Sequence, residues 1–205
     1  MSVSVPFVGV KGVVFDMDGT LTDSPLDFDL IRSECGVPAG QPILEYLRGA
    51  PEAERGRILG ILDSHERRAA AACTLREGAR EVLGELARRG VRTALLTRNS
   101  AESVRTVLGR FGLEFDCWLS REHCQPKPSP QPVLAIAERL GVAPAELLVV
   151  GDYVFDVEAG RAAGSRTALL STGKLRRAVP QADVVIETLW ELLDVLADGE
   201  EEESQ

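Results

Sequence analysis

Two aspartates separated by one residue, Asp16 and Asp18, directly follow a short apolar run, Val13–Phe15. Carboxylates at the carboxyl end of a buried strand are costly unless a cation compensates their charge. A divalent metal ion would do so, and carboxylate oxygens are hard ligands that suit Mg²⁺. The structural alternative is a turn, since Asp and Gly are common in turns and Gly19 permits a sharp exit from the strand. By itself the pair is explained equally well by a magnesium site and by an Asp-Gly turn.

A second pair of carboxylates, Asp152 and Asp156, follows another apolar run, Leu147–Val150. The four-residue separation predicts that both side chains lie on one face of the helix that begins there. Helix capping by Asp152 is the structural alternative, and it would not require Asp156. Acids from separate strands can meet at the carboxyl edge of a parallel sheet, where open α/β sheets bind ligands.

Two further residues fit the same edge of the sheet. Thr97 ends the run Thr93–Leu96 and precedes a predicted helix, so its hydroxyl and the nearby backbone amides could hold an anion. Lys127 lies in a proline-stiffened loop and could neutralise a phosphate and the neighbouring carboxylates. Taken singly, a helix cap for Thr97 and an exposed loop position for Lys127 are the better explanations.

Short apolar runs alternate with helical patterns through most of the chain, which predicts an α/β fold with a doubly wound, Rossmann-like parallel sheet. The runs lack polar alternation, as expected of strands buried on both faces. The predicted strands are Val13–Phe15, Thr93–Leu96, Cys117–Leu119, Leu147–Val150, Thr167–Leu170 and Val184–Ile186. The predicted helices between and after them are Glu77–Arg89, Ala101–Phe111, Pro130–Leu140, Val154–Ala163 and Leu189–Leu196.

From about residue 25 to residue 74 this alternation stops, and no convincing strand is found. The helical patterns in this stretch are Leu26–Cys35, Pro42–Arg48 and Glu52–Cys73. We therefore expect a helical cap, residues 23–75, inserted into a core made of residues 1–22 and 76–197. The hinges would be Leu21–Ser24 and Leu75–Gly78.

Composition excludes several classes of protein. The 205 residues are 44% hydrophobic, enough for a sizeable core, and 32 acids against 23 bases give a net charge of −9. That balance argues against a nucleic-acid or anionic-membrane partner, which would require a basic face. Five acids fall within residues 198–205, which predicts a solvated, disordered tail.

Targeting signals and metal-binding cysteines are not evident either. No apolar stretch approaches the ~18 residues that span a bilayer, and the first ten residues do not resemble a signal peptide. The four cysteines are scattered and only two histidines accompany them, so we expect reduced thiols in a cytoplasmic protein.

The ordered set of chemical residues resembles the haloacid dehalogenase superfamily of phosphohydrolases. Its four motifs read here as DMDGT, LLT, the lysine of PKPSP, and GDYVFD, and the resemblance covers about residues 11–190. The first and last motifs are specific, whereas the threonine and lysine matches are weak without them. The helical insertion matches the position of that family's cap, and the pattern is similar to the phosphoglycolate phosphatase and β-phosphoglucomutase branch.

The resemblance implies a role for each motif. Asp16 would be the nucleophile that forms an aspartyl-phosphate, and Asp18 would protonate the leaving alcohol and later activate water. Thr97 and Lys127 would bind the phosphoryl oxygens, and Lys127 would also be a catalytic residue. Arg98 is a further candidate for binding the phosphate.

The same resemblance implies a Mg²⁺ site and a substrate class. The metal ligands would be Asp16, the backbone carbonyl of Asp18, Asp152, and Asp156 directly or through water. The expected activity is hydrolysis of a small phosphorylated metabolite, with a phosphomutase or a catalytically idle phosphate-binding regulator as alternatives. A monomer and a homodimer remain equally open.

The arginines of the predicted cap are candidates for binding a substrate carboxylate, since arginine does so bidentately. Most arginines on helices are solvated, and we expect that of most of these. They are Arg32, Arg48, Arg55, Arg57, Arg67 and Arg68.

Overall fold

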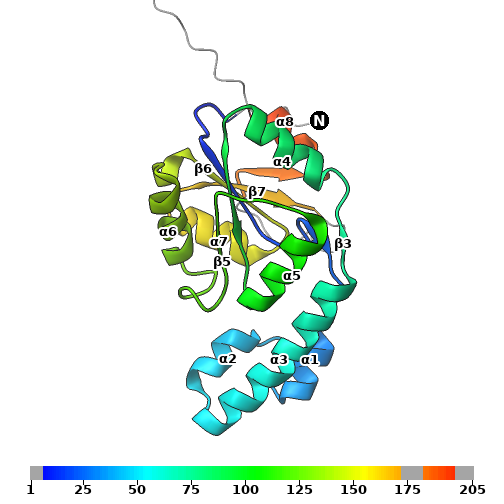
Figure 1. Cartoon of the computed structure of the whole chain (residues 1–205). Coiled ribbons are helices and arrows are strands. Elements are labelled where there is room, and N and C mark those ends of the chain that lie inside the picture. The colour runs from blue at the N-terminus through cyan, green and yellow to red at the C-terminus, as the bar shows by residue number, and fades with distance from the viewer. Residues whose placement is uncertain (1–6, 172–181, 197–205) are drawn as a thin grey trace, which may run out of the picture.

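The computed structural model describes residues 7–171 and 182–196, and a six-stranded parallel sheet lies at its centre (Figure 1). The strand order is β5-β4-β1-β6-β7-β8. The strands are β1 (Gly12–Phe15), β4 (Arg92–Leu96), β5 (Cys117–Leu119), β6 (Leu147–Gly151), β7 (Arg166–Leu170) and β8 (Val184–Ile186). The doubly wound α/β fold and all six predicted strands are confirmed. The predicted acidic tail lies outside the described residues.

The central strands bring the chemical motifs to one edge. β1 lies between β4 and β6 and is buried throughout, which explains its uninterrupted apolar sequence. Phe15, its last residue, pairs with Leu95 of β4 and with Val150 of β6. The three strands therefore end almost level, and the residues that follow them emerge side by side.

Helices cover both faces of the sheet, and a separate hydrophobic cluster lies between the sheet and the helices on each face (Figure 1). One face is covered by α4 (Ala79–Arg88), α5 (Ala101–Phe111) and α8 (Glu191–Val195), and the other by α6 (Gln131–Leu140) and α7 (Val154–Ala162). These helices agree with the predicted ones to within a few residues. Within the described ranges, no helix is long and apolar enough to cross a membrane.

Three of the four helices between β1 and β4 form a separate group beyond one end of the sheet (Figure 1). They are α1 (Phe28–Cys35), α2 (Ile43–Gly49) and α3 (Glu52–Ala72). Their buried side chains, including Ile31, Leu47 and Ile58, make a third hydrophobic cluster. We refer to α1–α3 as the cap, and its division from the core at residues 23 and 75 is a proposal.

A two-residue ribbon joins the cap to the core. β2 (Thr22–Asp23) pairs antiparallel with β3 (Thr74–Leu75), so that Thr22 faces Leu75 where the chain leaves and re-enters the core. These strands fall at the expected hinges but were not predicted as strands. Two residues are too few to show a strand periodicity.

Candidate active site

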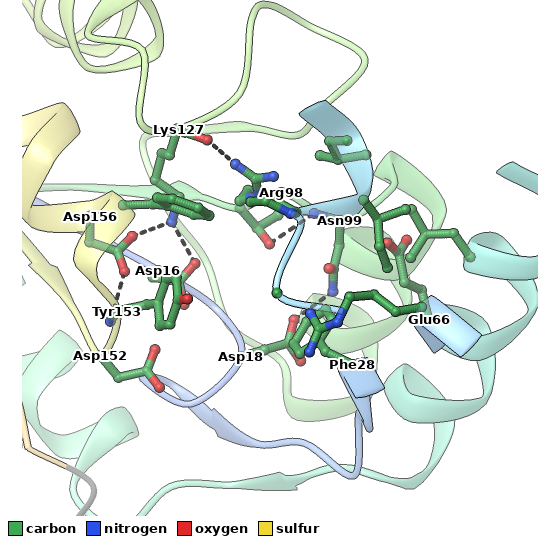
Figure 2. Close-up of a pocket in the computed structure, with 18 residues that line it drawn as sticks. Asp16, Asp18, Phe28, Glu66, Arg98, Asn99, Lys127, Asp152, Tyr153 and Asp156 are labelled. Atoms are coloured by element: carbon green, nitrogen blue, oxygen red, sulfur yellow. Dashed lines mark hydrogen bonds and ion pairs between the residues drawn. The ribbon is translucent and has the colours of Figure 1, made fainter. Parts of the chain in front are cut away.

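Lys127 lies at the centre of the site, between two of the predicted acids (Figure 2). Its Nζ donates to Asp16 Oδ1 at 2.6 Å, to the Leu96 carbonyl at 2.8 Å, and to Asp156 Oδ1. The side chain is only 3% exposed, so it is not an exposed loop residue. Burial opposes its charge, but Asp156 and Asp16 outweigh burial and raise the pKa of Lys127. The ammonium therefore stays charged near neutral pH.

Asp16, Asp152 and Asp156 form a cluster in which one oxygen of each lies within 4.8 Å of the others. Burial raises the pKa of Asp16 well above its ordinary value and, with the charge of Asp156, raises the pKa of Asp152 to about 6. Lys127 alone cannot compensate three carboxylates. This all-oxygen set, short of positive charge, fits a small hard dication such as Mg²⁺.

Asp18 does not join this cluster through its carboxylate, and its expected metal contact, a backbone carbonyl, stays a prediction. The residue after Asp18 is a glycine that lies close to Asp152 of the cluster. Gly19 has φ +87°, and a Cβ there would lie 2.2 Å from Asp152 Oδ2. A side chain at residue 19 would therefore displace a carboxylate of the site.

The second acid pair is held differently from the prediction. α7 begins at Val154, so Asp152 lies before the helix and the two acids do not share a helical face. Asp156, not Asp152, forms the capping contact, because its Oδ2 accepts a 3.2 Å hydrogen bond from the Tyr153 amide. The turn between β6 and α7, rather than helical spacing, brings the two carboxylates together.

Asn99 is a site residue that the sequence pattern did not identify. Its Nδ2 donates to Asp18 Oδ2 (Figure 2). Burial raises the pKa of Asp18, while hydrogen bonds, including that from Asn99, oppose the shift. A carboxyl group with a raised pKa suits proton donation. The available signal was the position of Asn99, in the short polar loop that directly follows β4.

Thr97 lies in the same loop and is 3% exposed. It does not cap the following helix, because the Ser100 side chain does so by accepting from the Ser103 amide. Its Oγ1 accepts from the Asn99 amide at 3.2 Å. Thr97 thus faces the same cavity as Asp16, and phosphate binding by its hydroxyl stays a prediction.

Arg98 is engaged by the cap. Its Nη1 and Nη2 donate to Glu45 Oε1 and Oε2 of α2 at 2.9 and 2.6 Å. The guanidinium carbon lies 4.6 Å from the centre of the Phe155 ring, and Nη1 also donates to the Lys127 carbonyl. Phosphate binding by Arg98 stays a prediction, and this pairing favours a role in holding the cap against the core.

A second contact between cap and core is more deeply buried. Glu66 of α3 is 2% exposed, and both its oxygens accept from Arg121 Nη1, at 2.6 and 2.7 Å. Its Oε2 also accepts from the Ser100 amide at 2.9 Å, and Arg121 pairs with Asp63 as well. Sequence position gives no sign of these partners, because 55 residues separate Glu66 from Arg121.

The acids and the cap line the same cavity, which has a volume of about 350 Å³. The core supplies most of its charged groups, while the cap supplies a largely apolar wall with Phe28, Ile43, Leu44 and Leu62. The volume is at the lower end of the range for sites that bind small molecules.

Comparisons with known proteins identify the family of the chain. A haloacid dehalogenase-like hydrolase family model matches residues 29–164. An uncharacterized hydrolase of Saccharomyces cerevisiae is 32% identical over 91% of each chain. An N-acetylmuramic acid 6-phosphate phosphatase of Pseudomonas aeruginosa is 28% identical over 91% of this chain and 95% of its own.

The same fold is found in a solved hydrolase from Pseudomonas syringae. That structure has a TM-score of 0.76 and 23% identity, over 90% of this chain and 96% of its own. Fold, ordered motifs and relatives thus agree, and the chain belongs to the haloacid dehalogenase-like hydrolases.

Proposed function

We propose that this hydrolase is a Mg²⁺-dependent phosphatase that cleaves a small phosphorylated metabolite through an aspartyl-phosphate. One observation carries the proposal: the Lys127 ammonium bridges Asp16 and Asp156, with an oxygen of Asp152 within 4.8 Å of theirs. These four residues line the same cavity, which supports their proposed roles as nucleophile, fixed cation and hard oxygen ligands.

In the first step, a carboxylate oxygen of Asp16 attacks phosphorus and the bond to the leaving oxygen breaks. Asp18 gives its proton to that oxygen, and its raised pKa keeps the proton available. Lys127 holds Asp16 in place and faces the charge that develops on the phosphoryl group. A bound Mg²⁺ would reduce the repulsion between carboxylate and phosphate.

In the second step, water attacks the phosphorus of the aspartyl-phosphate. Asp18, now ionised, takes a proton from that water, and Asp16 leaves as a carboxylate. Inorganic phosphate is the product. Because the cap forms one wall of the cavity, the reaction would be limited to substrates that fit beneath the cap.

The relatives support the phosphatase class, since one of them is named for its action on a sugar phosphate. The net charge of −9 supports a small-molecule partner rather than a nucleic acid or an anionic membrane surface. The four cysteines are free thiols, which supports a reducing, cytoplasmic location.

Phosphate release from an aryl phosphate, with and without Mg²⁺, tests the proposal. We expect Asp16→Asn to lower turnover by about 10³-fold or more, because an amide is a poor nucleophile. Circular dichroism should show an unchanged fold. Near-native activity in Asp16→Asn would contradict the mechanism.

Two further outcomes would favour the alternatives. Conversion of a sugar monophosphate to its isomer without release of phosphate would indicate a mutase. Phosphate binding without turnover of any ester would indicate a regulatory protein.

A further inference from the structure

One cap residue in the cavity has a hydrogen-bond donor without an acceptor. Arg32 of α1 lines the cavity, and its Nε is buried with no partner among the described residues. Nη2 pairs with Asp29, but that carboxylate is 91% exposed, so water competes for the contact. Buried donors are rarely left unpaired in folded proteins, and a ligand is one ordinary explanation for such a group.

The other cationic side chains that line the cavity are already paired. Lys127 is held by Asp16 and Asp156, and Arg98 is held by both oxygens of Glu45. Arg32 therefore has the least compensated charge among the described cations of this cavity.

The neighbours of Arg32 place it on the side of the proton donor. Phe28 lies four residues earlier on α1, so the two side chains share a face of the helix. Phe28 and Asp18 both line the cavity, and Figure 2 shows them on the same side of it, away from Asp152 and Asp156. Because Asp18 is the proposed donor to the leaving alcohol, this side of the cavity receives the leaving group.

We propose that Arg32 binds an anionic group on the alcohol part of the substrate. The substrate class is then a short phosphate ester with a second anion, a carboxylate or a second phosphate, at the end away from the reacting phosphorus. This inference rests on the proposed phosphatase function. The apolar side chains of Ile43, Leu44 and Leu62 contact the carbon skeleton between the two anions. A guanidinium matches either anion with a two-pronged hydrogen bond.

Three esters of one three-carbon chain test the proposal: 3-(phosphonooxy)propanoate, propane-1,3-diol bisphosphate and 3-hydroxypropyl phosphate. We expect the wild type to prefer at least one of the two esters with a second anionic group over 3-hydroxypropyl phosphate, which has none, by about tenfold or more in kcat/KM. Arg32→Gln should raise KM for that ester by about 10–100-fold and change KM for 3-hydroxypropyl phosphate by no more than about threefold. Arg32→Lys should restore part of the loss.

Arg48→Gln is the matched control, because Arg48 is an exposed cap arginine that does not line the cavity. It should leave all three esters unchanged. Equal loss on all three esters in Arg32→Gln, or no preference in the wild type, would overturn the inference while leaving the phosphatase assignment intact.

A binding measurement separates this inference from the chemistry. Calorimetry with Asp16→Asn should show that the preferred ester with two anionic groups binds about tenfold or more tighter than 3-hydroxypropyl phosphate. Adding Arg32→Gln should remove that difference. Equal affinity for all three esters in the Asp16→Asn protein would overturn the inference, whatever the activity of the wild type.

Discussion

The ammonium of Lys127 has three oxygen partners and almost no contact with solvent. A buried cation of this kind compensates the negative charge of its neighbours, and it avoids the entropy loss and salt screening that weaken exposed ion pairs. Removing it would leave Asp16 and Asp156 facing each other across a buried space, and an isolated buried charge is strongly destabilising.

For this reason we expect Lys127→Met to lower kcat by about 10²-fold or more and to lower the unfolding temperature without Mg²⁺. Phosphate-release kinetics and thermal unfolding measure the two effects. Lys11→Met is the control, because Lys11 makes a single pair, with Glu146, and is 64% exposed. A Lys127→Met protein with activity within tenfold of the wild type would contradict the assigned role.

Glu66 gives a prediction about pH. Burial raises the pKa of Glu66 even though Arg121 opposes the shift, so the folded chain holds this proton more tightly than the unfolded chain. The stability that this group contributes is complete below the ordinary glutamate pKa of about 4.3 and is lost as pH rises through the raised pKa.

Glu66→Gln cannot ionise, so it should lack this dependence. We expect the unfolding free energy of the wild type, minus that of Glu66→Gln, to fall as pH rises from about 4 to 7. Urea unfolding of both proteins at several pH values measures this difference. The contributions of the other acids cancel in it, because both proteins contain them. A difference that stays constant or rises with pH would show that the pKa of Glu66 is not raised.

At the scale of elements, two arginines connect the cap to the loops that follow β4 and β5. Arg98 binds Glu45 of α2, and Arg121 binds Glu66 of α3, which also accepts from the Ser100 amide. The loop that carries Thr97 is therefore fixed partly by the cap. We therefore expect the position of the cap and the geometry of the Thr97 loop to be coupled.

A double-mutant cycle tests that coupling. Glu45→Gln and Arg98→Gln should each lower kcat/KM, and the double variant should lose less than the sum of the two, by about 1 kcal/mol. Glu54→Gln is the control, because Glu54 bonds Tyr46 within the cap. Strict additivity of Glu45→Gln and Arg98→Gln would show that the pair does not act as a unit.

Most core elements could be predicted because their signals are local. β1 and β6 are buried on both faces and read as uninterrupted apolar runs. The β2–β3 ribbon has no such signal. Its two-residue strands depend on a partner about 50 residues away, and no periodicity can develop in so short a segment.

Some residues of the site have a local sequence signal, and others do not. Asp16 and Asp156 could be found because they follow buried strands, whereas Glu45 and Glu66 lie on cap helices among many other charged residues. Their partners are 53 and 55 residues distant, so only the packed cap identifies them. The misplacement of Asp152 has a local cause, since a four-residue spacing does not show where the helix begins.

At the scale of the whole molecule, the excess of acids has a thermodynamic consequence. Three of them, Asp16, Asp152 and Asp156, each have an oxygen within 4.8 Å of the others, and their mutual repulsion destabilises the folded state. A cation that binds only this arrangement stabilises the fold by mass action.

We therefore expect Mg²⁺, at about 100 times its Kd, to raise the unfolding temperature by about 5–10 °C, and EDTA to reverse the shift. Asp152→Asn should abolish most of it. Asp29→Asn, which removes an exposed acid of the cap, should not. An equal shift from NaCl at matched ionic strength would indicate screening rather than a site.

The β2–β3 ribbon also affects how such a protein can change over evolutionary time. Thr22 and Leu75 are ladder partners, so the whole cap is inserted between two points that already touch. To the core, an insertion of any size at this position is equivalent to the loop of a hairpin, and its length leaves the register of the six-stranded sheet unaltered. We therefore expect that this one segment can be lengthened, shortened or replaced while Asp16, the proposed nucleophile, and its neighbouring acids stay in place.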